Sequence, residues 1–268
     1  MNTTSKKKLS LSFWLLVIGL IGLGIYSLIS LRQTAAIYDG VLAMQANINS
    51  GSVKKVDFAG NDKPFNIPNW TLFRPGELWS LTSRDHHLPD GFETPELVNT
   101  EVAHGDSGQP MKVQKQIEAP LKALFDAAEK DGIELMLSSA YRSVDDQKQL
   151  YEQFVAEQGQ DMAELYVVEP GASEHHTGLS VDFSTASAAC EADSDKCSLA
   201  QDAAAWLFEN GPRFGFIQRY PEGKQPLTGV AFEPWHYRYL GIPMAKMVAA
   251  SGLTYDEIVR QVAPGYAR

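Results

Sequence analysis

Residues 173–182 read SEHHTGLSVD, and the rest of the chain is organised around this stretch. It places an imidazole at His175 and a carboxylate at Asp182, two side chains that bind zinc, on either side of a glycine. From Leu179 to Phe183 apolar and polar residues alternate, which predicts a β-strand with Asp182 pointing away from the core face. We expect His175 to lie in the loop before this strand and to share one metal site with Asp182.

Residues 233–236 read EPWH and supply a second imidazole, His236, three positions after the carboxylate of Glu233. Catalytic zinc sites commonly hold the ion with three nitrogen or oxygen side chains and leave a fourth position for water. His236 completes such a set with the imidazole and carboxylate of residues 173–182, and Glu233 is the candidate general base. On a regular strand Glu233 and His236 would face opposite sides. Pro234 interrupts the ladder, however, and a bulge there could turn both inward.

Local spacing alone leaves simpler interpretations open. A single histidine is more often a hydrogen-bonded structural residue, and His176 beside His175 indicates that one of the two is not a ligand. Trp235 and Tyr237 could be core or wall aromatics. The chain has no His-Glu-x-x-His sequence, which excludes the common helical zinc-protease arrangement.

The segment before the first stretch predicts a helix, a strand and a second helix. Apolar residues recur at helical spacing over residues 110–132, and Pro120 should kink this helix or divide it. Alternation over residues 133–139 predicts a half-buried strand, and Ser143 can cap the helix that follows. Arg142 therefore falls at a junction between strand and helix, where it either forms a surface ion pair or reaches into a site.

The segment after the first stretch predicts two more strands, at residues 214–220 and 230–239, and two more helices. Because strands and helices mix without a regular β-α-β alternation, we predict an α+β fold with a mainly antiparallel sheet flanked by helices. Capping boxes predict where the two helices start, at Ser198 with Gln201 and at Thr254 with Glu257.

The N-terminus predicts a transmembrane helix. Three lysines at positions 6–8 precede residues 9–31, an apolar run long enough for one membrane crossing. Positive charge before the span predicts a cytoplasmic N-terminus and an outer remainder. We therefore divide the chain into tip and anchor (1–31), membrane-proximal stalk (32–75) and catalytic domain (76–268). A long cleaved signal peptide is the alternative to an anchor.

The composition excludes one class of partner. The 268 residues carry a formal net charge of -10, whereas a nucleic-acid-binding protein needs a basic face. The two cysteines, Cys190 and Cys197, lie close together in a polar segment. They either form a local disulfide in an oxidising compartment or remain two thiols.

Residues 173–182 and 233–236 resemble the Ser-x-His-x-x-Gly-x-Ala-x-Asp and Glu-x-Trp-His signatures of the D-Ala-D-Ala metallopeptidases, in particular those of the VanY-like D-alanyl-D-alanine carboxypeptidases. Tyr141-Arg142-Ser143 with Gln147 resembles the Tyr-Arg-Ser-x-x-x-Gln segment of the same family. The resemblance covers roughly residues 80–242. One departure is Ser180 in place of the usual alanine, and one small residue for another leaves the metal assignment unchanged.

The resemblance implies a role for each matching residue. Glu233 corresponds to the catalytic base, and Arg142 to the arginine that holds the substrate and stabilises the oxyanion. Ligands to one zinc ion are implied at His175, Asp182 and His236. Positions near the substrate pocket are implied at Ser173 and Gln147.

The resemblance also implies a reaction, the removal of the terminal D-Ala from bacterial peptidoglycan stem peptides that end in D-Ala-D-Ala. Such peptides lie outside the cell membrane, in agreement with a single-pass anchor and an extracytoplasmic catalytic domain. Alternatives within the superfamily are an L,D-carboxypeptidase, a D-Ala-D-Ala dipeptidase and a peptidoglycan endopeptidase. An alternative of another class is a zinc-containing cell-wall binding module without catalysis, which would need neither Glu233 nor Arg142.

Overall fold

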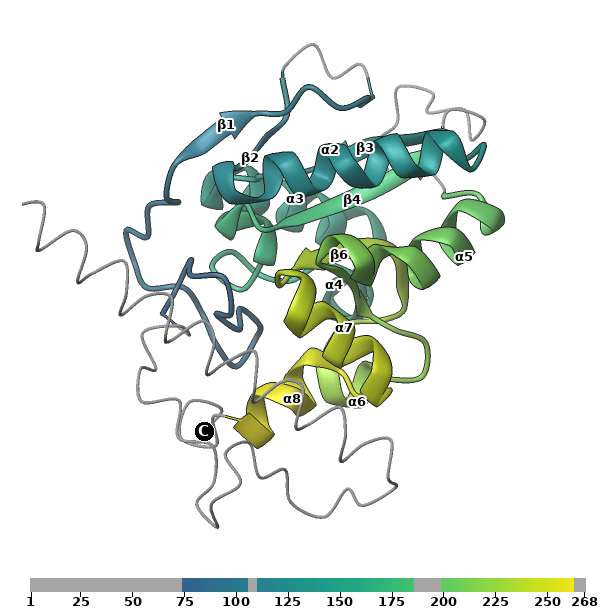
Figure 1. Ribbon diagram of the computed structural model, residues 1–268. Helices are drawn as coiled ribbons and strands as arrows, with labels where there is room; N and C mark the ends of the chain where they lie inside the picture. The colour runs from purple at the N-terminus through teal and green to yellow at the C-terminus, as the bar shows by residue number, and fades with distance from the viewer. Residues whose placement is uncertain (1–73, 106–109, 186–198, 263–268) are drawn as a thin grey trace, which may run out of the picture.

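A four-stranded antiparallel sheet forms the centre of the molecule (Figure 1). The computed structural model describes residues 74–105, 110–185 and 199–262. The sheet order is β3 (Leu135–Ser139), β4 (Ser180–Thr185), β6 (Glu233–Tyr239) and β5 (Phe216–Tyr220). A separate two-stranded sheet pairs β1 (Leu97–Asn99) with β2 (Lys112–Gln114). All pairs between these strands are antiparallel, which confirms that part of the predicted fold class.

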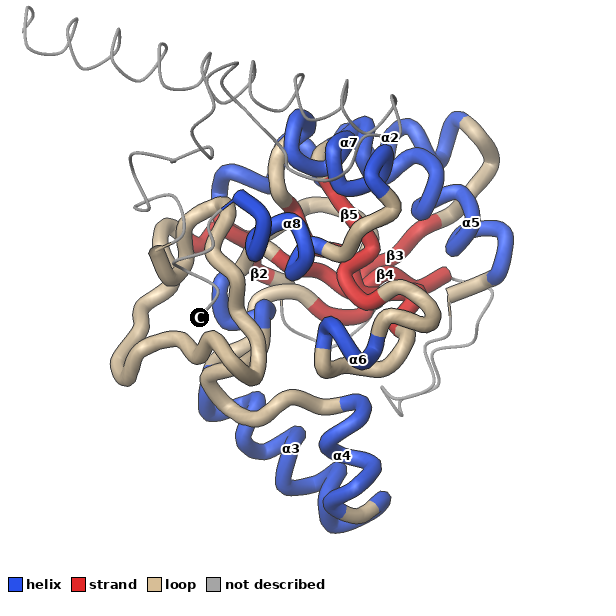
Figure 2. The backbone as a smooth tube through the Cα atoms, turned by 90° about the horizontal axis from the view of Figure 1, so that it is seen from below, coloured by secondary structure: helices blue, strands red, loops and turns tan. Residues whose placement is uncertain are grey.

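Helices flank the central sheet, as expected for an α+β fold. Figure 2 shows α3 and α4 side by side and separated from α2 by the strands. The α-helices are α2 (Lys115–Lys130), α3 (Val144–Gln158), α4 (Gln160–Tyr166), α5 (Gln201–Asn210), α6 (Gln225–Thr228), α7 (Ile242–Ser251) and α8 (Tyr255–Val262). Two short 3-10 helices are η2 (Glu174–Thr177) and η4 (Gly211–Phe214).

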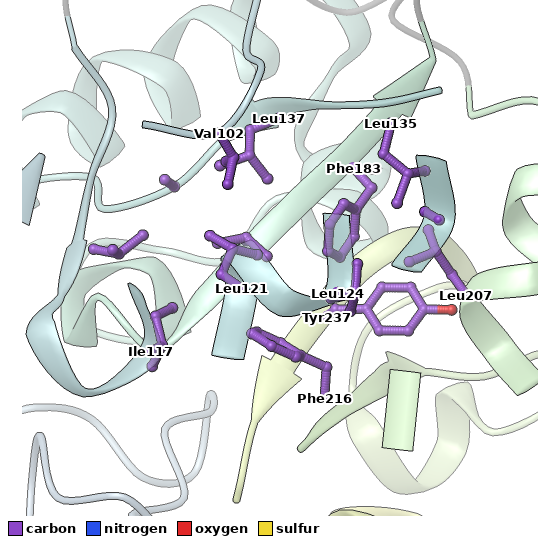
Figure 3. Close-up of a cluster of buried hydrophobic side chains, with 14 of the residues drawn as sticks. Val102, Ile117, Leu121, Leu124, Leu135, Leu137, Phe183, Leu207, Phe216 and Tyr237 are labelled. Atoms are coloured by element: carbon purple, nitrogen blue, oxygen red, sulfur yellow. The ribbon is translucent and has the colours of Figure 1, made fainter. Parts of the chain in front are cut away.

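One face of the sheet packs against α2 and α5 and forms the apolar core (Figure 3). Val181 and Phe183 of β4 both point to this face, because alternate residues of a strand point the same way. Tyr237 of β6 lies opposite Val181, and its ring meets that of Phe183 edge to face with centroids 5.4 Å apart. The α2 side of this core is formed by the buried Ile117, Leu121 and Leu124.

The opposite face of the sheet is polar and also buried. Ser180 and Asp182 alternate with the core residues of β4, and their cross-strand partners on β6 are Arg238 and His236. All four side chains are buried. The prediction that Asp182 points away from the core is therefore confirmed, and this second face carries the candidate site.

Residues 74–96 wrap onto the domain without forming a regular helix or strand. The indole Nε1 of Trp79 donates to the carbonyl of Leu240 at 2.9 Å. The backbone N–H of Leu88 donates to the carbonyl of Gly171 at 2.9 Å. The segment is thus held both at the end of β6 and at the loop before residues 173–182.

Two of the predicted helix caps are present in the structure, and a third is wrong. Ser143 caps α3, since its hydroxyl accepts the Asp146 N–H at 3.1 Å. The Thr254 and Glu257 capping box of α8 is also present, with bonds of 2.8 and 3.2 Å. The start of α5 is corrected, because its N-cap is Ala200, which offers no side-chain acceptor.

The helix predicted over residues 110–132 needs one correction, at its start. Residues 112–114 form β2, and the helix begins at Lys115. The amide Nε2 of Gln114 donates to the carbonyl of Thr177 at 2.7 Å, which ties this strand to η2. Pro120 lies inside α2 without dividing it.

Several predictions fall on residues outside the described part. They are the anchor, nearly all of the stalk, and the proposed pairing of Cys190 with Cys197. Among the helices that the structure describes, none is long and apolar enough to cross a membrane.

Candidate active site

The register between β4 and β6 builds the centre of the site. Asp182 and His236 are direct cross-strand partners, so their side chains emerge on the same face. Asp182 Oδ1 lies 3.0 Å from His236 Nδ1, and Asp182 Oδ2 lies 3.2 Å from His175 Nε2. The candidate donor atoms of the three residues all lie within 4.8 Å of one another.

His175 reaches the site from η2, a single 3-10 turn where the sequence predicted a loop. Gly178 ends this turn with a φ of 65°, and a Cβ there would come within 3.0 Å of the backbone nitrogen of Gln114. The glycine is therefore required by both conformation and space. The Nδ1 of His175 lies 2.7 Å from the carbonyl oxygen of Ala140, which leaves Nε2 toward Asp182.

Glu233 joins the site through the irregularity predicted at Pro234. Gln218 pairs with Tyr237 but Tyr220 pairs with Glu233, so β6 contains extra residues between these two pairs. This bulge brings Glu233 Oε2 to 3.8 Å from His236 Nδ1. Burial raises the pKa of the Glu233 carboxyl to about 8, although the nearby His236 opposes the rise. A carboxyl with such a pKa is suited to proton transfer near neutral pH.

The donor set fits zinc. Around a tetrahedral zinc ion with bonds of about 2.0–2.2 Å, ligand atoms lie about 3.3–3.6 Å apart. Asp182 brings Oδ1 to 3.0 Å from His236 Nδ1 and Oδ2 to 3.2 Å from His175 Nε2, and one donor atom from each residue lies within 4.8 Å of the other two. Two imidazoles and one carboxylate would leave the ion with a net positive charge. Burial lowers the pKa of His175, so this imidazole is neutral and ready to bind a metal.

Arg142 lies at the junction of β3 and α3 and lines the same cavity as the three donors. Its backbone N–H donates to the carbonyl of His175 at 3.2 Å. Its Nη2 donates to Ser139 Oγ at 2.7 Å, and its Nη1 donates to Gln147 Oε1 at 2.9 Å. Of the two interpretations that the sequence leaves open, the structure supports the one in which Arg142 reaches into a site.

Ser173 and Gln147 also line the cavity, which has a volume of about 430 Å³. Ser173 Oγ accepts the N–H of His175 at 3.3 Å. Gln147 is buried, and its Nε2 donates to the carbonyl of Val168 at 2.7 Å while its Oε1 accepts from Arg142. The apolar part of the lining consists of Leu150, Phe154, Met162, Tyr166, Val230 and Trp235.

His176 is not among the three grouped donors, as expected for one of the adjacent histidines. Its Nε2 accepts the N–H of Gly171 at 3.2 Å, which requires the ring proton to be on Nδ1. Nδ1 then donates to the carbonyl of Arg142 at 2.8 Å. His176 thereby joins the Arg142 junction to the loop before residues 173–182.

Glu174 has a place in the site that the sequence did not reveal. It is 1% exposed, and its carboxylate lies 3.0 Å from Arg219 Nε and 3.1 Å from Arg238 Nη1. Burial alone would raise its pKa, but these two guanidinium groups hold the pKa well below its usual range. No local signal marks this role, because its partners come from β5 and β6, far along the chain.

The sheet, the His-Asp-His centre and the adjacent carboxyl and guanidinium groups define the chain as a zinc metallopeptidase by class. A sequence model of the family described as VanY, D-alanyl-D-alanine carboxypeptidase, matches residues 110–242. The putative carboxypeptidase YodJ of Bacillus subtilis is 36% identical over 194 residues, which are 72% of this chain and 70% of that protein. The chain belongs to the VanY family of D-alanyl-D-alanine carboxypeptidases.

The solved structures that are similar to this one include two carboxypeptidases. The LdcB LD-carboxypeptidase has a TM-score of 0.62 at 33% identity, covering 70% of this chain and 88% of that chain. The vancomycin resistance D,D-pentapeptidase VanY from the VanB-type cassette, in complex with Zn(II), has a TM-score of 0.57 at 35% identity. That match covers 68% of this chain and 99% of the other.

Proposed function

We propose that this protein is a zinc-dependent D,D-carboxypeptidase that removes the terminal D-Ala from peptidoglycan stem peptides ending in D-Ala-D-Ala. The observation that carries the proposal is the convergence of His175, Asp182 and His236, with their donor atoms within 4.8 Å. Glu233 and Arg142 line the same cavity, and a binding module without catalysis would need neither. Membership of the VanY family supports the substrate class.

The ion held by His175, Asp182 and His236 would supply Lewis acidity and lower the pKa of a bound water to about 7. Glu233 is placed to take the proton from the attacking water, because its Oε2 lies 3.8 Å from His236 Nδ1, the ring nitrogen that would bind the ion. The same carboxyl then delivers the proton to the amine of the departing D-Ala.

Arg142 contributes a fixed positive charge beside the reacting carbonyl. Ser139 and Gln147 each accept a hydrogen bond from its guanidinium group, so its orientation is set before the substrate arrives. Preorganised charge of this kind stabilises a developing oxyanion by several kcal/mol in comparable sites. Ser173 and Gln147 line the cavity and complete the polar side of the substrate pocket.

We place the catalytic domain outside the cell membrane and attach it by residues 9–31. D-Ala-D-Ala stem peptides lie in the cell-wall compartment, so a domain that cleaves them must lie on the outer side of the membrane. The three lysines at positions 6–8 set the orientation. Fractionation of cells that express the full chain, followed by protease treatment of intact spheroplasts, tests this placement. Protection of the catalytic domain from the protease would contradict it.

An L,D-carboxypeptidase that acts on tetrapeptide stems is the second candidate. It is favoured by one observation, the similarity to the LdcB LD-carboxypeptidase at a TM-score of 0.62 and 33% identity. The two activities differ in the stereochemistry of the residue before the scissile bond. The choice therefore depends on how the cavity wall receives that side chain.

A panel of defined stem peptides tests the function. The purified full chain is incubated with pentapeptide stems, tetrapeptide stems and crosslinked dimers, each with and without a chelator. The products are identified by mass spectrometry. We expect loss of one alanine from the pentapeptide, abolished by the chelator and restored by zinc. Cleavage of the tetrapeptide alone would select the second candidate, and no cleavage of any stem with zinc present would refute both.

A further inference from the structure

Glu174 directly precedes the ligand His175 in the chain. Its side chain, however, is directed toward the second ligand histidine, His236. Its Oε2 lies 3.6 Å from His236 Nε2, and the two side chains are 0% and 5% exposed. Among the described residues, that nitrogen has no partner at hydrogen-bond distance. A buried imidazole nitrogen therefore faces a buried carboxylate across a short gap.

The two nitrogens of His236 have different surroundings. Nδ1 lies 3.0 Å from Asp182 and 3.8 Å from Glu233, which makes it the nitrogen on the metal side. Nε2 is then the nitrogen that carries the proton. In the other ligand, His175, the corresponding Nδ1 lies 2.7 Å from the carbonyl of Ala140. Ligand histidines generally give their second N–H to a carbonyl or carboxylate, which fixes the ring and raises its basicity.

Glu174 is itself held by groups from other elements. Arg219 Nε donates to its Oε1 at 3.0 Å, and Arg238 Nη1 lies 3.1 Å from the same oxygen. Arg219 in turn makes two hydrogen bonds to Asp256 of α8, at 2.6 and 3.1 Å. Two arginines and two carboxylates thus form a buried, connected set.

We propose that Glu174 is a positioning residue for the metal ligand His236, and that Arg219 and Asp256 hold Glu174 in place for this task. α8 lies beyond residues 110–242, the part matched by the family model, yet it connects to the metal ligand through these contacts. This inference rests on the proposed zinc site. It adds that the C-terminal helix helps to set the metal affinity.

A purely structural role accounts poorly for this arrangement. Burying four charged groups carries a large desolvation cost, and well-packed apolar residues often give equal or greater stability. The apolar core lies on the opposite face of the sheet and needs none of these charges. The charged set lies directly behind His236, where a carboxylate alters the basicity of the ring.

Ser180 offers a milder way to change the same carboxylate. Its hydroxyl donates to Glu174 Oε2 at 3.1 Å, the oxygen that faces His236. Replacing Ser180 with alanine, the residue of the family pattern, removes a competing donor without adding volume or charge. The oxygen is then freer to accept from His236, so this variant should bind zinc more tightly.

The test measures zinc affinity in the full chain by competition with a chromogenic chelator, together with the absorption spectrum of the cobalt-substituted protein. We expect Glu174→Gln to bind zinc about 10- to 100-fold more weakly and to alter the cobalt spectrum. Asp256→Asn should weaken binding in the same direction by a smaller factor. At saturating zinc the KM for the stem peptide should stay unchanged in both variants.

Glu257→Gln is the matched control, because it removes one negative charge from the same helix and keeps an acceptor for the Thr254 cap. Its zinc affinity should equal that of the wild type. Wild-type affinity and an unaltered cobalt spectrum in both Glu174→Gln and Asp256→Asn would overturn the proposal. If Glu174→Gln does not fold, the zinc affinity of Asp256→Asn tests the proposal in its place. Weaker zinc binding in Ser180→Ala would also contradict the proposal. A wild-type chain that binds no zinc would instead refute the proposed function.

Discussion

Asp182 on β4 and His236 on β6 are direct partners in the sheet, with Oδ1 and Nδ1 3.0 Å apart. Because side chains alternate along a strand, this register puts both residues on the polar face and leaves Val181 and Tyr237 on the core face. A slip of one residue would turn either ligand into the apolar core. The packing of that core therefore also fixes the geometry of the metal site.

The two adjacent histidines give a matched pair of variants. His175→Ala should lose zinc, because two of the three donors cannot hold the ion tightly. His176→Ala should keep one zinc per chain, with a lower melting temperature and a modest loss of rate, since His176 bonds to the backbone of Arg142. Elemental analysis of the two purified variants checks this. Equal loss of zinc in both would contradict the assignment of His175.

Glu233→Gln should retain zinc and lose activity. The amide keeps the size of the side chain but cannot accept a proton from water, and general-base catalysis is typically worth about 10²–10⁴-fold. The measurement is kcat on the pentapeptide stem alongside zinc content. A variant with full activity would show that the attacking water is deprotonated elsewhere.

Arg142→Ala should also retain zinc, since Arg142 is not among the grouped donors. We expect kcat/KM to fall by about 10²–10³-fold, as when one oxyanion-stabilising group is removed. Arg142→Lys keeps the charge but loses at least one of the two bonds to Ser139 and Gln147 that orient the group. It should recover only part of the rate. Loss of zinc in Arg142→Ala would mean that Arg142 acts on the metal site as a whole.

Some of the site could be predicted because local patterns encode it. Alternation over residues 179–183 places Asp182 on the polar face, and Pro234 predicts the irregularity that brings Glu233 inward. The resemblance adds the ligand set. These features depend on residues within a few positions of one another, where chain geometry is strongly constrained.

Other features could not be predicted from local patterns. The role of Glu174 depends on Arg219, Arg238 and Asp256, which only the folded sheet and α8 bring together. Likewise, helical spacing continues before Lys115, but residues 112–114 pair with β1 instead, so tertiary contacts override the local pattern. Contacts between distant segments leave no periodic signal in the sequence.

Zinc and a proton compete for His236, which predicts how metal binding depends on pH. Burial alone would lower the pKa of His236, but the adjacent carboxylates of Asp182, Glu174 and Glu233 raise it to about 9. Because the imidazole must lose its proton to bind zinc, the affinity should rise as the pH increases from about 6.5 to about 9. Chelator competition at several pH values measures this.

The stability of the protein without zinc should change in the opposite direction. A pKa raised above the unfolded value means that protonated His236 stabilises the fold fully below about pH 6.5. That contribution is lost as the pH rises through about 9. Burial also raises the pKa of Glu233 from 4.5 to about 8. The folded state, which keeps this carboxyl neutral, therefore also loses stability as the pH rises from 4.5 to about 8. The increase in melting temperature caused by zinc should therefore be larger at pH 9 than at pH 6.5. An increase that is equal at both values would show that His236 binds zinc without releasing a proton.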